Sequence, residues 1–217
     1  MRSGPLRLLR CPHCGGRGVI PSLRSGNTFG ERLWTDGWRS APMLPGIPHF
    51  IECPACHRCL WLTNELIEDP PESDSAFDDL PQVHEPGFLA YLGALSSGVS
   101  RSIEDEVFLR TRAWWRSNDP QRHGLSEQRN GEYVAARAGN MRQLLALLEQ
   151  ERRAQRDARA ELLRELERFD ECRAVLSAKR GGAATELTPW ISRLCEAGDC
   201  LVREVPVQQP RRIVIRL

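Results

Sequence analysis

Two pairs of cysteines near the N-terminus carry the clearest chemistry of the sequence. Cys11 and Cys14 are separated by two residues, and so are Cys53 and Cys56. A tight turn with this spacing presents two thiolates to one metal ion, and two such turns complete a tetrahedral site of four sulfur ligands. The sequence therefore predicts one structural zinc ion held by these four side chains.

A fifth cysteine complicates the choice of ligands, because Cys56 and Cys59 have the same spacing. We favour Cys53 with Cys56, since Pro54 repeats the position of Pro12 in the first pair. The apolar residues that follow Cys59 are typical of a strand that leaves the turn. Cys59 stays open as an alternative ligand, or as a redox thiol that displaces a ligand on oxidation.

No pattern of catalytic residues accompanies the cysteines. Catalytic zinc sites keep one position open and usually include histidine or carboxylate ligands. His13 and His57 adjoin ligand cysteines, and we expect both to face solvent. The sequence contains no nucleophile elbow, P-loop or dinucleotide-binding glycine motif. We therefore expect a protein that is not an enzyme.

The elements that position the cysteines are predicted to be short strands. Residues 1–62 are typical of a zinc ribbon, in which two turns end short hairpins and the metal replaces a large hydrophobic core. Between the cysteine pairs, Asp36-Gly37 predicts a hairpin turn with positive φ at both residues. Trp34 and Trp38 then either face each other or flank the turn.

Charge is distributed unevenly along a chain whose formal net charge is only +1. Residues 1–62 contain eight arginines and three acids, whereas residues 63–87 contain eight acids and no base. The second segment is also rich in proline and poor in apolar residues, which is typical of a linker. We expect an acidic tether at 63–87.

The remaining chain is predicted to be helical over residues 88–205, with an extended tail at 206–217. Ser102 is expected to cap a helix that ends near Asn118, and further helices are expected at 127–138 and from Asn140. Thr188-Pro189 is a typical helix start and Gly198 a typical stop. The tail either stays free or pairs with a ribbon strand. The predicted fold class is α+β.

Residues 160–172 resemble the middle of a tetratricopeptide repeat, in which a helix ends in leucine, a glycine turn follows, and an aromatic residue and two acids open the next helix. The matching residues are Leu166, Arg168, Phe169, Asp170 and Glu171. Glu167 replaces the usual glycine and Cys172 the usual alanine. The match covers about one repeat of ~34 residues, and it implies TPR-like helical hairpins.

A second resemblance covers most of the chain. The strings at 25–30, 34–37 and 41–45, followed by the Trp-Trp-Arg segment at 114–119, are similar to a group of uncharacterised bacterial proteins with a zinc ribbon of the C-P-x-C type. This resemblance implies a ribbon joined to a helical part and carries no activity with it.

Two functions suit these features. Stacked helical hairpins and clustered tryptophan and arginine side chains favour a protein–protein adaptor. Its candidate interaction surface comprises Trp34, Trp38, Trp114, Trp115 and Arg116. The arginines of residues 1–62 favour nucleic-acid binding as the alternative.

The cellular location is predicted from what the sequence does not contain. Residues 1–10 include three arginines and no apolar run of the length that a secretion signal needs. No segment approaches the ~20 apolar residues of a membrane-spanning helix. We expect a cytoplasmic protein whose cysteines bind metal rather than form disulfides.

Overall fold

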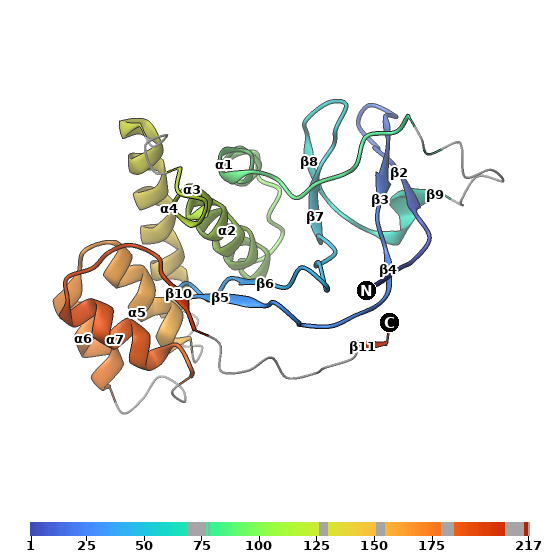
Figure 1. Cartoon of the computed structure of the whole chain (residues 1–217). Helices are drawn as coiled ribbons and strands as arrows, with labels where there is room; N and C mark the ends of the chain where they lie inside the picture. The colour runs from blue at the N-terminus through green and yellow to red at the C-terminus, as the bar shows by residue number, and fades with distance from the viewer. Residues whose placement is uncertain are drawn as a thin grey trace. The chain divides into compact units, whose positions relative to one another are not determined.

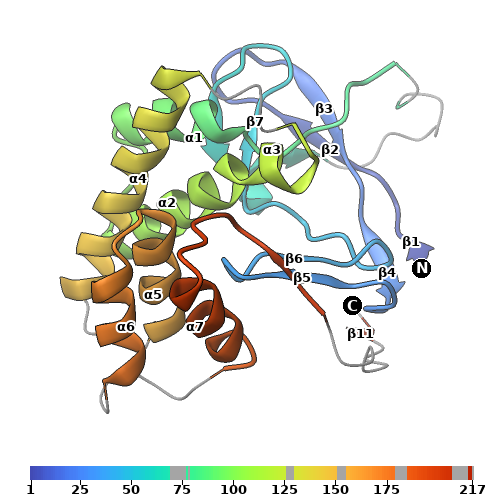
Figure 2. The same ribbon diagram turned by 60° about the vertical axis from the view of Figure 1, so that its left-hand side comes forward.

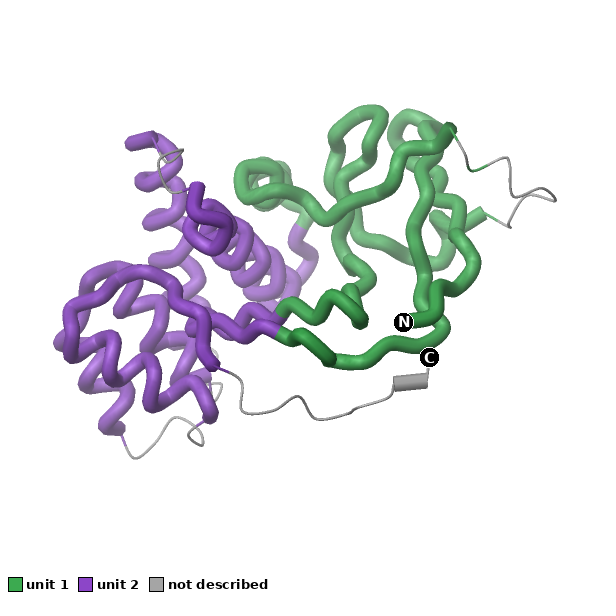
Figure 3. Tube along the Cα trace, viewed as in Figure 1, with its two compact units in different colours: residues 1–31, 40–99, 208–217 green, residues 32–39, 100–207 purple. Residues whose placement is uncertain are grey.

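A computed structural model describes residues 1–68, 77, 79–125, 130–150, 155–178, 185–206 and 215–216. Small antiparallel sheets in the N-terminal region are followed by helices, which confirms the predicted α+β class (Figure 1). The chain forms two compact units (Figure 3). Unit 1 comprises residues 1–31, 40–99 and 208–217, and unit 2 comprises residues 32–39 and 100–207.

This division differs from the predicted boundaries at 62, 87 and 205. Residues 32–39 belong to unit 2, although they lie inside the predicted ribbon. Helix α1 (Phe88–Ser96) belongs to unit 1, although it lies inside the predicted helical domain. Helix α1 belongs to unit 1 because its Phe88 and Tyr91 side chains are buried there. The Tyr91 ring stacks on the Phe50 ring, with 5.7 Å between the ring centroids.

Unit 1 is built from short antiparallel strands. One sheet has the order β3-β2-β9, and β7 and β8 form a separate hairpin. The strands are β2 (Arg7–Arg10), β3 (Arg17–Ile20), β7 (Phe50–Glu52), β8 (Cys59–Trp61) and β9 (Ile67–Glu68). The first cysteine pair lies between β2 and β3 and the second between β7 and β8, as expected for turns that end hairpins.

The core of unit 1 includes residues of the predicted linker. Val83 is buried with Leu9 and Ile51, and Phe77 is buried with Leu8 and Val19. The backbone N–H of Val83 donates to the Val19 carbonyl at 2.9 Å. The two ends of segment 63–87 are therefore parts of the folded unit, because their apolar side chains complete its core. Residues 69–76 and 78 lie outside the described part of the chain.

A further sheet of unit 1 contains the last strand of the chain. Its order is β1-β4-β11, formed by β1 (Arg2–Ser3), β4 (Leu23–Gly26) and β11 (Ile215–Arg216). Strand β11 runs antiparallel to β4, with Ile215 opposite Gly26. Of the two alternatives predicted for the tail, these two residues adopt the paired one. Residues 207–214 and 217 of the predicted tail lie outside the description.

Unit 2 consists mainly of helices, and α5, α6 and α7 lie side by side in it (Figure 2). Its helices are α2 (Ile103–Ser117), α3 (Asp119–Arg122), α4 (Gly131–Gln150), α5 (Arg156–Glu165), α6 (Phe169–Ser177) and α7 (Thr188–Glu196). Ser102 caps α2 by accepting from the Asp105 N–H at 3.2 Å, as predicted. The core buries Trp114, Leu144, Leu162 and Ile191.

Helix α4 corrects one prediction, because it runs continuously through Gly139 and Asn140. The predicted break assumed that the Asn140 side chain caps a new helix. Instead this side chain is buried and donates to the Arg110 carbonyl at 3.0 Å. The amide group therefore links α4 to α2, and its hydrogen bond replaces the one that a cap would form.

The helices α5 and α6 meet at a tight turn where the repeat resemblance places one. The Arg168 N–H donates to the Leu163 carbonyl and the Glu167 N–H to the Arg164 carbonyl, which is the pairing of a Schellman motif. Glu167 has a φ of 61°, the conformation that glycine favours. Gly198 ends α7 with a φ of 65°, which confirms the predicted stop.

Residues 32–39 form a hairpin, which we call hairpin 32–39. Its strands β5 (Arg32–Trp34) and β6 (Arg39–Ser40) lie in one sheet with β10 (Glu204–Val205), in the order β10-β5-β6. Within the turn only Gly37 has positive φ, at 82°, so the predicted turn type is wrong. The Gly37 N–H donates to the Trp34 carbonyl, which makes a type I turn followed by a glycine bulge.

Candidate metal centre

The first cysteine pair lies on a turn closed by its own backbone. The Cys11 N–H donates to the Gly16 carbonyl at 2.9 Å, and the Gly15 N–H donates to the Cys11 carbonyl at 2.8 Å. Gly15 has a φ of 72°, which lies in the left-handed region that glycine favours. These bonds aim both thiols of the pair toward the same side of the turn.

The second pair repeats this turn with different residues. The His57 N–H donates to the Cys53 carbonyl and the Cys53 N–H to the Arg58 carbonyl, both at 2.9 Å. His57 has a φ of 58° at the position that corresponds to Gly15. A histidine in the left-handed region is strained relative to glycine. The sequence has no glycine at this position to signal the turn, and only the cysteine spacing predicts it.

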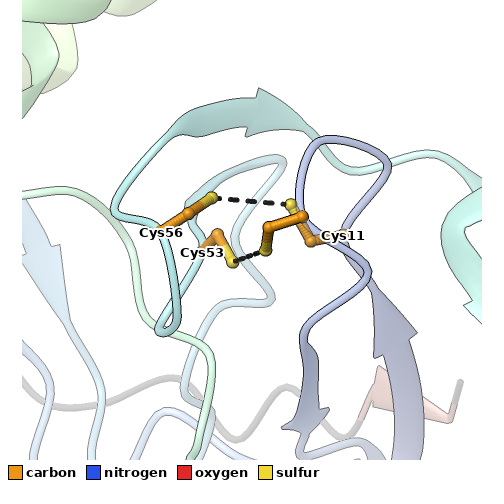
Figure 4. A group of neighbouring side chains, drawn as sticks. Cys11, Cys53 and Cys56 are labelled. Carbon is orange, nitrogen blue, oxygen red and sulfur yellow. Dashed lines mark hydrogen bonds between the residues drawn. The ribbon is translucent and has the colours of Figure 1, made fainter.

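The four sulfur atoms come together between the two turns (Figure 4), all within 4.8 Å of one another. The Sγ atoms of Cys11 and Cys56 are 3.8 Å apart, and so are those of Cys14 and Cys53. Four sulfurs around a zinc ion at ~2.3 Å lie about 3.8 Å from each other, whereas a disulfide needs ~2.05 Å. The four predicted ligands therefore fit one tetrahedral metal ion, and all four are free thiols.

The surroundings favour deprotonation of part of this cluster. Desolvation raises the pKa of the Cys11 thiol, but hydrogen bonds from the backbone of His13 and Cys14 outweigh it and bring this pKa down to about 7. The Gly16 N–H donates to Cys14 Sγ at 3.3 Å and also favours the thiolate, but the neighbouring cysteine thiols and desolvation outweigh it and raise the pKa of Cys14. Since metals bind the thiolate form, these backbone donors would stabilise the ligands of a bound ion.

Cys59 lies outside the cluster. Its half-buried thiol donates to the Ala90 carbonyl, with 3.8 Å between sulfur and oxygen. Burial and the Glu52 carboxylate raise the pKa of this thiol to about 11. Such a thiol carries little thiolate at neutral pH, which gives no support to the redox role. The four sulfur atoms that lie together do not include Cys59, so the structure gives no support to its alternative role as a ligand either.

The two neighbouring histidines also lie outside the cluster. His57 is largely exposed, and its Nδ1 lies 2.9 Å from Glu52 Oε1. His13 Nδ1 lies 3.5 Å from an Arg58 guanidinium nitrogen. In the described parts of the chain, the four cysteines form the only group of three or more side chains placed to hold a metal ion.

Comparison of the chain with protein-family models, curated proteins and solved structures gave no match. None of the helices among the described residues has both the length and the apolar character needed to cross a membrane.

The predicted interaction residues all lie in unit 2 and differ in exposure. Trp34 and Trp114 are buried, so these two do not form an exposed surface. Trp38 and Trp115 are half-buried, with ring centroids 5.3 Å apart. The Arg116 guanidinium lies 4.3 Å from the Trp38 centroid. Trp38, Trp115 and Arg116 form a compact cluster, which we call the Trp38 cluster.

Sequence reasoning missed a buried ionic network in unit 2. Glu165 accepts from Trp114 Nε1, from the Asn118 amide and from Arg137. On the same helix, Arg164 pairs with Glu161, and both side chains are fully buried. Charged residues at this spacing normally indicate a solvent-exposed helix face, so no signal in the sequence distinguishes this helix from a surface helix.

Proposed function

We propose that the protein is a zinc-stabilised adaptor without catalytic activity, whose helical unit binds a protein partner in the cytoplasm. The observation that carries the metal part is the 3.8 Å spacing of the sulfur atoms, which suits a tetrahedral zinc ion. Four protein sulfurs leave no position for substrate or water, and this supports a structural rather than a catalytic ion.

Metal analysis combined with thiol titration tests the metal part. We expect one zinc ion per chain and three classes among the eight thiols. The partly exposed Cys59 and Cys200 react slowly in the native protein because both have a raised pKa, the four cluster thiols react together after chelation, and the buried Cys172 and Cys195 react only on denaturation. A chain with no bound metal would contradict the proposal. Visible absorption typical of iron bound to thiolates would show that the bound ion is iron and not zinc.

The Trp38 cluster supports the adaptor part. Tryptophan and arginine are the residue types most enriched at the energetic centres of protein interfaces. Trp38, Trp115 and Arg116 lie together and retain partial exposure. A partner that offers apolar and acidic side chains would complement this cluster.

Affinity capture with matched variants tests the adaptor part. We expect wild-type protein to retain a specific partner from an extract of the source cells, and Arg116→Ala to lose it. Arg173→Ala is the control, since Arg173 lies on α6 and pairs only with the exposed Asp170 among described contacts. Loss of the partner with both variants, or no specific partner at all, would contradict this surface.

The alternative of nucleic-acid binding has weaker support. Arg10 and Arg17 share Glu68 as an ion-pair partner, while Arg32 and Arg39 pair with Glu204 and Glu186. Half of the arginines that motivated this alternative are therefore matched by carboxylates. A shift in DNA or RNA mobility that weakens as salt increases would favour the alternative over the adaptor.

A further inference from the structure

Hairpin 32–39 is part of the core of unit 2, although it lies between the two cysteine pairs in the sequence. Leu33 and Trp34 are only 1% and 7% exposed. In the ladder of β5 and β10, Val205 lies opposite Leu33 and Glu204 opposite Trp34. The Thr35 N–H extends this pairing by donating to the Arg203 carbonyl at 2.9 Å.

The turn of hairpin 32–39 also completes the polar contacts of unit 2. The Asp36 carboxylate accepts from Arg122 and from the Asn118 amide, and the Asp36 carbonyl accepts from Trp115 Nε1 at 2.9 Å. Thr35 Oγ1 accepts from the buried Arg164 at 3.4 Å. Without the hairpin, these donors would lose partners inside a core, which is costly. The helical unit is therefore incomplete without this segment.

The flanks of the same hairpin are held in unit 1. The Asn27 N–H donates to the Met43 carbonyl at 3.3 Å. Gly26 approaches this residue so closely that a Cβ atom on it would lie 2.3 Å from the Met43 oxygen. The chain leaves unit 1 after Glu31 and returns to it at Ser40. One segment thus depends on both units for its conformation.

The cysteine cluster closes the loop that carries the hairpin. Cys14 and Cys53 are 39 positions apart in the sequence and their sulfur atoms 3.8 Å apart. A metal ion that links them restricts the conformations of the loop when the hairpin is undocked, as any cross-link does. The cross-link removes more conformations from the loop with the hairpin undocked than from the loop with the hairpin docked. It therefore shifts the equilibrium toward the docked hairpin.

We infer that metal binding at the four cysteines stabilises the helical unit through hairpin 32–39. The inference rests on the proposed metal site. It adds that the metal stabilises unit 2, although all four cysteine ligands belong to unit 1. By thermodynamic linkage, folding of unit 2 must then tighten metal binding by the same factor. Metal binding at the four cysteines thereby adds to the stability of unit 2, which carries the Trp38 cluster.

The full chain with Trp61→Phe allows a direct test. Trp61 is the only tryptophan of unit 1, and the other five belong to unit 2. Tryptophan fluorescence of this variant therefore reports unit 2. We expect its thermal midpoint to fall by about 10 °C when zinc is removed with a chelator and to recover when zinc is restored. Complete loss of the transition on chelation, reversed by zinc, is the stronger form of the same result.

Two further variants in the Trp61→Phe background show whether the effect acts through the cluster. Cys53→Ser should melt at the metal-free midpoint whether or not zinc is added. Cys59→Ser should keep the full zinc-dependent shift, since Cys59 lies outside the cluster. Chelation that releases metal and four thiols but leaves the midpoint unchanged would overturn the inference and leave the metal site intact. A chain that never binds metal would contradict the proposed function instead.

Discussion

The carboxylate of Asp36 accepts a hydrogen bond from the guanidinium of Arg122, although 86 positions separate them in the sequence. Their side chains are 0% and 3% exposed. Burial raises the pKa of Asp36 to about 6 despite the attraction of Arg122, which acts in the opposite direction. This pair links the turn of hairpin 32–39 to α3, and the free energy of unfolding of unit 2 depends on it.

Removal of one partner of this pair should be strongly destabilising. We expect Asp36→Ala to lower the free energy of unfolding by roughly 3 kcal/mol, because it removes the fully buried one of the two carboxylates that pair with Arg122 and leaves only Asp119. Urea unfolding followed by tryptophan fluorescence measures the effect. Asp170→Ala is the matched control, since Asp170 is 94% exposed and its loss should change the free energy by less than about 0.5 kcal/mol. Equal losses in the two variants would contradict the role of the pair.

The buried Glu161 predicts a distinctive pH dependence. Burial raises its pKa from 4.5 to about 7, although Arg164 favours the charged form. The folded protein therefore binds the proton more tightly than the unfolded chain, and Glu161 loses stabilising effect as pH rises between these values. Relative to Glu161→Gln, the wild type should lose up to about 3 kcal/mol of unfolding free energy from pH 4.5 to pH 7.

The opposite sign is expected for an exposed glutamate, which serves as the control. The hydrogen bond from Arg168 lowers the pKa of Glu171. Its contribution is therefore present above the unfolded pKa and is lost as pH falls through the folded value. Relative to Glu171→Gln, the wild type should gain stability as pH rises through this range. For each variant, the difference in unfolding free energy from the wild type is plotted against pH. If the two differences change with pH in the same direction, burial of Glu161 has no effect on its titration.

Single cysteine substitutions test the ligand assignment independently of chelation. Cys53→Ala should bind metal at least tenfold more weakly and leave unit 1 unfolded, because the small core of the unit relies on the closed site. Cys59→Ala should retain one metal ion per chain, since its thiol lies outside the cluster and contacts Ala90. Metal content and far-ultraviolet circular dichroism distinguish the two. Loss of metal in Cys59→Ala would reopen the choice of ligands.

The parts of the fold that local chemistry determines could be predicted from the sequence. The spacing of Cys11 and Cys14 defines a turn by itself, and a second identical spacing identifies its partner. The cap at Ser102 and the stop at Gly198 likewise depend on neighbouring residues only. These features needed no knowledge of which segments meet in space.

The parts that depend on distant contacts could not be predicted in this way. Asp36-Gly37 predicts a hairpin, but its assignment to unit 2 depends on Arg122 and Arg164, which lie far along the chain. Val83 lies in an acidic, proline-rich segment whose composition indicates a tether, yet it completes the core of unit 1. Composition describes a segment alone, whereas burial depends on what surrounds it.

The strained residue at the turn between α5 and α6 allows a stabilising substitution. Glu167 has positive φ at the position that follows the helix cap, where glycine is most favourable. Glu167→Gly should raise the free energy of unfolding by about 0.5–1 kcal/mol, because relief of strain exceeds the added entropy of the unfolded chain. Glu167→Ala removes the same contact with the Cys200 thiol but keeps the strain, so it should give no gain. Urea unfolding compares them, and equal stability of the two variants would mean that the left-handed backbone at Glu167 costs the protein nothing.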